Sequence, residues 1–82
     1  MESKRKQVLY RCTHRGMKEI DELLGSFIQY NLDSISDEML VELEALLDES
    51  DNDLYTWITG YELGPRSFQP ILEKIRKHHG VS

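Results

Sequence analysis

The chain has 82 residues, a net charge of −5 and one cysteine, Cys12. A chain of this length buries too little surface to enclose a deep active-site cavity, and we expect residues 1–82 to form a single domain. One cysteine excludes an internal disulfide and any zinc site built from several cysteines. No apolar run approaches the ~20 residues that cross a bilayer, and no signal-peptide core lies near the N-terminus. These features predict a cytoplasmic protein without membrane insertion.

The charged residues are separated into blocks along the chain. Residues 1–18 hold six lysines and arginines, residues 19–65 hold thirteen acids and no lysine or arginine, and the tail from Arg66 onward is basic again. This separation predicts that the basic ends lie against or beside the acidic middle. A nucleic-acid-binding domain of this size is normally basic overall, and the acidic block would repel a duplex. Nucleic acid is therefore not the expected partner.

The first half of the chain predicts two helices. Between residues 4 and 14 the apolar side chains follow helical spacing, and Gly16 lies where a C′ residue would end the helix. The run from Met17 to Ile28 has the strongest helical pattern, with one apolar stripe opposite a charged face. Gly25 lies inside that helix at a cost of roughly 1 kcal/mol relative to alanine, which predicts a neighbouring helix packed closely against it.

A third helix is expected after the loop of residues 31–36. Ser36 is positioned to cap it, and its apolar stripe predicts a buried inner face. The outer face carries the carboxylates of Glu42, Glu44, Asp48 and Glu49. Nothing in the sequence predicts that these carboxylates are buried, so we interpret them as a solvated face and not as general acids.

Two shorter helices follow. The fourth is expected from about Asp53 to Thr59, with Gly60 as its stop and Trp57 in the core. The fifth begins near residues 67–68, tolerates Pro70 in its first turn, and ends in a basic cluster that suits the helix dipole. No segment alternates like a strand. The predicted fold class is therefore all-α, a compact bundle of five short helices.

The histidines do not predict a metal site. His78 and His79 are adjacent, and neighbouring helical residues point about 100° apart, so the pair cannot chelate one ion from a single face. His14 is interpreted as a solvated residue at a helix end. We expect no metal, no catalytic residue and no tightly bound cofactor.

The candidate site lies at the junction of the first two helices and consists of Arg15, Gly16, Met17 and Glu19. A glycine at such a junction permits a positive φ and a close approach by another backbone, and Arg15 and Glu19 offer opposite charges four residues apart. These are properties of a partner-binding motif, with no nucleophile. The simpler alternative is a helix-breaking glycine beside a surface ion pair worth ~0 to 1 kcal/mol.

A resemblance favours the first interpretation. Residues 15–21, Arg-Gly-Met-Lys-Glu-Ile-Asp, followed by Phe27 and by residues 53–58, Asp-Leu-Tyr-Thr-Trp-Ile, resemble the small succinate dehydrogenase assembly factors. This flavinator family is called FAD assembly factor SdhE in bacteria. The similarity spans roughly residues 8–75.

The resemblance implies a five-helix protein that is not an enzyme. It would bind the flavoprotein subunit of succinate dehydrogenase and promote covalent attachment of FAD there. Arg15, Gly16 and Glu19 would belong to the contact, with Met17 beside them, whereas residues 53–58 would be mainly structural, with Asp53 as a candidate cap. A start close to the first helix, without an Arg-rich leader, suggests a bacterial member.

Three questions stay open at this stage. The main alternative is an antitoxin-like or regulatory bundle that binds its partner through the acidic face. The sequence does not say whether fumarate reductase is a second partner or whether FAD itself is contacted. A monomer is expected, because an acidic exterior gives no self-complementary patch.

Overall fold

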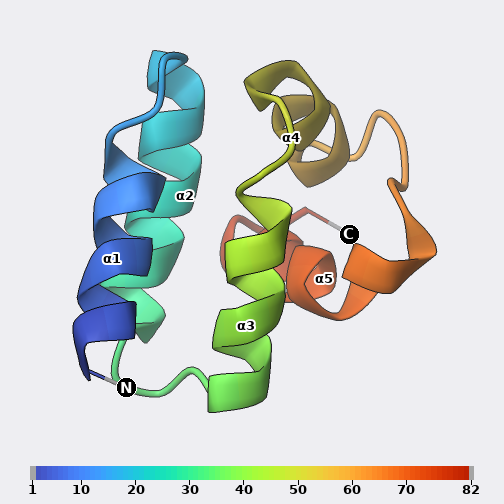
Figure 1. Ribbon diagram of the computed structural model, residues 1–82. Helices are drawn as coiled ribbons and strands as arrows, with labels where there is room; N and C mark the ends of the chain where they lie inside the picture. Colours follow the sequence, from blue (N-terminus) through green and yellow to red (C-terminus); the bar gives the residue numbers. More distant parts are fainter. Residues whose placement is uncertain (1, 82) are drawn as a thin grey trace.

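The computed structural model describes residues 2–81 and contains five α-helices and one short 3₁₀ helix, with no strand in that range (Figure 1). The helices are α1 (Glu2–Thr13), α2 (Lys18–Asn31), α3 (Asp37–Leu46), α4 (Asp51–Ile58) and α5 (Gln69–His78), with the 3₁₀ helix η1 (Arg66–Phe68) before α5. The predicted all-α, five-helix architecture is confirmed.

The first three helices run up, down and up beside one another, and α4 and α5 complete the bundle (Figure 1). Their apolar stripes meet in one core. Seventeen buried apolar residues form it: Val8, Cys12, Ile20, Leu24, Phe27, Ile28, Ile35, Leu40, Leu43, Leu46, Leu47, Leu54, Trp57, Ile58, Ile71, Leu72 and Ile75. Among the described residues no helix is long and apolar enough to cross a membrane.

Several local predictions are confirmed. Ser36 caps α3, where its side-chain oxygen accepts a hydrogen bond from the Met39 amide at 3.1 Å. A Cβ built on Gly25 would lie 3.1 Å from Thr13 Cγ2, so the missing side chain lets α1 and α2 pack closely. Gly60 follows α4 with a positive φ of 88°, a conformation that glycine adopts without strain.

The predicted start of the fourth helix is wrong by two residues. Residues 51 and 52 are helical, because Ser50 provides the cap by accepting a hydrogen bond from the Asp53 amide at 3.2 Å. Asp53 is therefore inside the first turn and is not the cap. Trp57 is buried as predicted, with 8% of its surface exposed.

One residue of the basic cluster at the end of α5 does not have the position that the sequence predicted. Arg76 faces inward and is 8% exposed. Its Nε donates to the Trp57 carbonyl at 2.8 Å, and its Nη2 donates to the Leu63 carbonyl at 2.7 Å. The guanidinium thus joins the end of α4 to the following loop and adds a charged donor to two carbonyls, which also accept from the Gly60 amide and the Gln69 side chain.

For the N-terminal segment, the separated charges meet as predicted. Four ion pairs join the basic N-terminal segment to the acidic middle: Lys4 with Glu44, Arg5 with Asp37, Arg11 with Asp48, and Arg15 with Asp51. The acidic outer face of α3 is consequently less solvated than expected. Glu42 on the same helix accepts a hydrogen bond from the Ile71 amide at 3.1 Å and so satisfies an N-terminal donor of α5.

Candidate partner-binding site

The loop between α1 and α2, residues 14–17, lies at the same end of the molecule as the start of α4 (Figure 1). We call it the Arg-Gly loop. Arg15 is turned toward the protein, with 15% of its side chain exposed. Its Nη1 donates to the Leu47 carbonyl at 2.8 Å and its Nη2 to the Glu49 carbonyl at 2.9 Å. Arg15 therefore connects the loop to the end of α3.

Asp51 is the second anchor of the loop. One carboxylate oxygen accepts a hydrogen bond from Arg15 Nε, and the other accepts one from the Met17 amide at 3.0 Å. These contacts hold the pKa of the Asp51 carboxyl below its usual value, with the Arg15 hydrogen bond as the largest cause. A charge-assisted pair at low exposure restrains both partners more than a surface pair does. The loop is thus fixed to α4 in one conformation.

Asp21 fixes the loop from the other side. Its Oδ1 accepts a hydrogen bond from the Arg15 amide at 2.6 Å. Two carboxylates from different helices therefore bind the backbone amides of residues 15 and 17, on either side of Gly16. The geometry leaves Gly16 itself exposed at the surface.

Gly16 does not have the positive φ that its position suggested. Among the described residues only Gly60, Gly64 and Gly80 have positive φ values. A Cβ on Gly16 would lie 3.7 Å from Asp51 Oδ2, which is an ordinary contact. Neither the local backbone nor the surrounding atoms require glycine at this position. If glycine is needed here, the reason is therefore contact with another molecule.

The Arg15–Glu19 ion pair of the simpler alternative is absent from the described contacts, because the guanidinium is bound to Asp51, Leu47 and Glu49. Glu19 is exposed on the first turn of α2. Met17 is half-buried and packs at the edge of the core. The four candidate residues therefore have different positions: Gly16 and Glu19 are at the surface, whereas Arg15 and Met17 are partly covered.

A shallow hollow of about 230 Å³ lies beside the loop. Its lining residues are Tyr10, Arg11, His14, Arg15, Gly16 and Asp51. Tyr10 is 62% exposed and stacks on the His14 ring with the ring centres 4.0 Å apart. The hollow is smaller than the roughly 300 to 1,000 Å³ of ordinary ligand pockets. It suits an inserted side chain of a protein partner better than a bound cofactor.

The sequence pattern did not identify Asp51 or the Tyr10–His14 pair. Asp51 lies in a long acidic block, where one carboxylate has no feature that separates it from the others. Tyr10 and His14 are four residues apart on a helix, and that spacing places two side chains side by side. Unlike the role of Asp51, the Tyr10–His14 contact could therefore have been predicted from the sequence.

The described residues contain no group of three or more histidine, cysteine, aspartate or glutamate side chains that could hold a metal ion. Burial raises the pKa of the Cys12 thiol to about 12, so it is not a nucleophile at neutral pH. His79 Nε2 contacts the Leu23 carbonyl at 2.8 Å, and His78 Nε2 contacts Ser26 Oγ at 3.0 Å. The two histidines thus tie α5 to α2.

Comparisons with known proteins agree with this description. Residues 6–79 match the family model for the flavinator of succinate dehydrogenase. A mitochondrial succinate dehydrogenase assembly factor 2 from Dictyostelium discoideum is 35% identical over 79 residues, which cover 96% of this chain and 56% of the relative. The relative from Meyerozyma guilliermondii is 43% identical over 65 residues, which cover 78% of this chain and 48% of the relative.

Bacterial relatives are more similar in length. The FAD assembly factor SdhE of Legionella pneumophila strain Paris is 34% identical over 70 residues, which cover 85% of this chain and 87% of the relative. The chain spans about half the length of the mitochondrial relatives named above. No solved structure gave a significant match. The family match covers nearly the whole chain and includes the Arg-Gly loop, and the chain therefore belongs to the flavinator of succinate dehydrogenase family.

Proposed function

We propose that this protein is an assembly factor that binds the flavoprotein subunit of succinate dehydrogenase and promotes covalent attachment of FAD to that subunit. Membership of the flavinator family supports the proposal. The bacterial relatives are named FAD assembly factors, and we propose the bacterial cytoplasm as the site of action. The protein would act as a binding partner and not as an enzyme.

The observation that carries the proposal is the conformation of Gly16. It is exposed between two amides that Asp21 and Asp51 hold in place, and nothing within the chain requires it to be glycine. A fixed backbone without a side chain is a surface that another backbone can approach closely. We infer that the Arg-Gly loop enters a cleft of the flavoprotein, with Gly16 at the point of closest approach.

The candidate residues then have separate roles in the proposal. Glu19, which is exposed, contacts the flavoprotein directly, and Met17 contributes apolar surface at the edge of the contact. Arg15 positions the loop, because its guanidinium already binds three groups within the chain. Prior fixing of a binding loop reduces the entropy lost on association.

Covalent attachment of FAD takes place in the partner, and the flavin supplies the chemistry of that bond. This chain would contribute by binding one arrangement of the flavoprotein more tightly than the others and so raising its population. The shallow hollow beside the loop offers no pocket of cofactor size. At the Arg-Gly loop we therefore propose a contact with a protein surface and not with a cofactor.

The test is the covalent flavin fluorescence of the flavoprotein subunit on a denaturing gel. Cells with the gene, without it, with Gly16→Arg and with Glu19→Ala are compared, and Glu22→Ala serves as control because Glu22 is an exposed acid on the same helix. We expect strong loss in the deletion and in both loop variants, and normal fluorescence in the control. Normal fluorescence in the deletion would refute the function, whereas loss in the deletion alone would refute the site.

A partner bound through the acidic face of α3, as in the antitoxin-like alternative, has less support. Glu44 and Asp48 form ion pairs with Lys4 and Arg11 of α1, and Glu42 binds a backbone amide of α5. A basic partner would compete with these internal contacts.

A further inference from the structure

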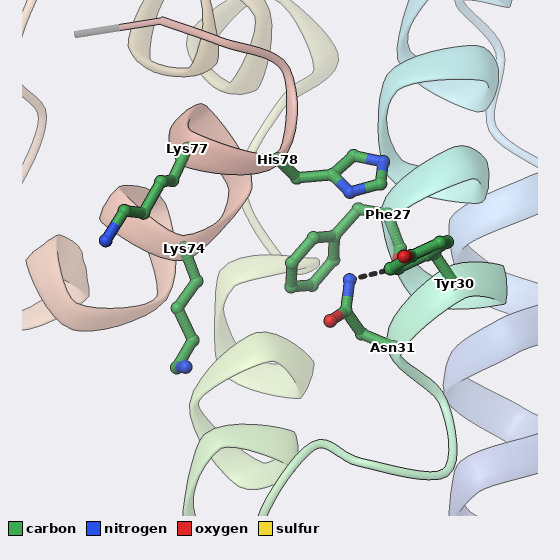
Figure 2. Close-up of a pocket in the computed structure, with 6 residues that line it drawn as sticks. All are labelled: Phe27, Tyr30, Asn31, Lys74, Lys77 and His78. Carbon is green, nitrogen blue, oxygen red and sulfur yellow. Dashed lines mark hydrogen bonds between the residues drawn. The ribbon is translucent and has the colours of Figure 1, made fainter.

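A second concave surface lies between α2 and α5, near the end of α2 that is remote from the Arg-Gly loop (Figure 2). We call it the α2–α5 groove. It encloses about 260 Å³, and its lining residues are Phe27, Tyr30, Asn31, Lys74, Lys77 and His78. The Asn31 side chain donates a hydrogen bond to the Phe27 carbonyl at 2.8 Å and is thereby held in place.

The aromatic part of the groove is already formed in the absence of any partner. The His78 ring meets Phe27 edge-on with 5.7 Å between ring centres, and its centre lies 5.6 Å from that of Tyr30. Ser26 Oγ contacts His78 Nε2 at 3.0 Å. Burial lowers the pKa of His78, and the neighbouring His79 lowers it further, which favours the neutral imidazole at pH 7.

The charge of the groove therefore comes from Lys74 and Lys77, which are exposed on α5. Four basic residues of the N-terminal segment are neutralised by internal ion pairs, and Arg76 is buried against carbonyl oxygens. Within residues 2–81 neither Lys74 nor Lys77 forms an ion pair. The groove thus presents two positive charges that no ion pair holds, next to Glu73 on the same helix, on a chain with a net charge of −5.

Tyr30 adds apolar surface beside these charges. It is 82% exposed, the highest exposure among the large hydrophobic side chains that the structure describes. Tyrosine at this exposure offers a rigid ring that loses little conformational freedom on binding, and such residues are enriched in protein interfaces. A surface with a preformed aromatic wall and a lysine rim is complementary to a peptide segment that carries both carboxylates and an apolar side chain.

We propose that the α2–α5 groove is a second docking surface for the flavoprotein subunit and binds an acidic segment of it. This inference rests on the proposed function. Lys74 and Lys77 pair with carboxylates of the segment, and Tyr30 covers one of its apolar side chains. Anionic membranes and nucleic acids are disfavoured because they extend a high density of negative charge over a chain of charge −5, whereas a short acidic segment needs to contact only the two lysines.

The position of the groove predicts what it contributes. The 14 residues of α2 rise about 1.5 Å each, which places the groove about 20 Å from the Arg-Gly loop. A single partner must be large to reach both surfaces, as a flavoprotein subunit is. Two contacts on one rigid body raise the overall affinity, because the second contact forms at a high effective concentration. The groove would therefore affect affinity and association rate, and the loop would affect flavin attachment.

The experiment measures binding of the purified apo-flavoprotein subunit to the full chain at low and moderate salt. The test variant is Lys74→Glu with Lys77→Glu, and the matched control is Lys6→Glu with Arg66→Glu, which changes net charge equally at exposed positions elsewhere. We expect the test variant to bind about tenfold or more weakly with a reduced salt dependence, and the control to bind within about twofold of wild type. Circular dichroism checks that both variants fold.

A second arm identifies the occupant. A photo-crosslinking amino acid in place of Tyr30 is expected to label a flavoprotein peptide rich in aspartate or glutamate. Equal affinities for the test and control variants would overturn the groove while leaving the function intact, provided that Gly16→Arg still prevents flavin attachment. Failure of the wild-type chain to bind would overturn both. Lysine-dependent binding to phosphatidylglycerol vesicles or to single-stranded DNA, with unchanged flavoprotein affinity, would assign the groove to another class of ligand and overturn the inference.

Discussion

Arg15 and Asp51 lie 36 positions apart in the sequence and form the ion pair that joins the α1–α2 loop to the start of α4. Both side chains are largely covered, with 15% and 22% of their surfaces exposed. The same Asp51 carboxylate also binds the Met17 amide, so one side chain restrains the backbone on one side of Gly16 and the guanidinium of Arg15 on the other. A structural ion pair is thus placed directly beneath the surface proposed to meet the flavoprotein.

Replacing Asp51 is expected to reduce partner binding more than stability. Asp51→Asn removes the charge from the pair with Arg15, and a hydrogen bond to a charged group contributes about 1.5 to 3 kcal/mol. The loop would then lose its fixed conformation while α4 keeps its Ser50 cap. Urea unfolding and flavoprotein affinity are measured on the same variant. Asp53→Asn is the control, because Asp53 is exposed one half-turn away, and an equal loss of affinity there would contradict the prediction.

The Asp51 pair also predicts how stability depends on pH. Because the pKa of Asp51 is lowered from 3.8 in the folded protein, its contribution is complete above that value and is lost as pH falls through the folded pKa. Wild type should therefore lose stability more steeply than Asp51→Asn below about pH 4. Unfolding curves at pH 7 and across pH 2 to 5 measure this difference. A constant difference between the two proteins over the whole range would refute it.

Gly16 is expected to separate folding from function. Gly16→Ala introduces a Cβ at an ordinary 3.7 Å from Asp51 Oδ2 without a positive φ, so the free energy of unfolding should change by less than about 0.5 kcal/mol. Gly16→Arg should also fold, since the residue is exposed, but its side chain would block the approach of a partner. Thermal melts and covalent flavin fluorescence distinguish the two effects. Unfolding of the arginine variant would remove its value as a test of the site.

Two other glycines provide a matched test of packing against the only tryptophan. Gly64 and Gly80 both have a positive φ, so alanine at either position costs about 1 to 2 kcal/mol in backbone strain. A Cβ at Gly64 would also lie 2.8 Å from the Trp57 ring, whereas one at Gly80 would meet nothing within 4 Å. Gly64→Ala should therefore be clearly the more destabilising of the two in urea unfolding. Equal losses would show that Trp57 moves aside freely.

Arg76 is expected to be a structural residue despite its place in a basic helix end. Arg76→Met removes the charged donor shared by the carbonyls of Trp57 and Leu63, and a hydrogen bond to a charged group contributes about 1.5 to 3 kcal/mol. We expect a loss of at least about 2 kcal/mol in the free energy of unfolding. Lys77→Met, at the next position on the exposed side, should change stability by less than about 0.5 kcal/mol. Similar values for both variants would refute this role.

The fold was largely predictable because its signals are local. Ser36 precedes its helix directly, Gly60 follows one, and Gly25 lies in the middle of an apolar stripe, so capping, termination and close packing could each be inferred from neighbouring residues. Arg76 was missed although it lies four residues after the buried Leu72, on the same face of α5. A basic residue at the end of a helix is already explained by the helix dipole, so the sequence offered no reason to expect that Arg76 faces inward.

The anchoring of the site could not be predicted in the same way. The location of the Arg-Gly loop follows from the motif, but its partner Asp51 is one of thirteen acids in a block that faces six basic residues. Pairing across 36 positions depends on how three helices pack, and no local pattern chooses among the candidates. An Arg15–Glu19 pair is the contact that the local sequence offers, but Arg15 instead pairs with the distant Asp51.

The four ion pairs of the basic N-terminal segment also determine when that segment can complete its contacts during synthesis. Their acidic partners lie between residues 37 and 51, so every one of them leaves the ribosome well after α1. Until Asp51 has emerged, the basic helix lacks some of its long-range partners, and Asp21 is the only one of the two anchoring carboxylates that can hold the Arg-Gly loop. The protein therefore becomes competent to recognise its partner only when most of its length has been translated.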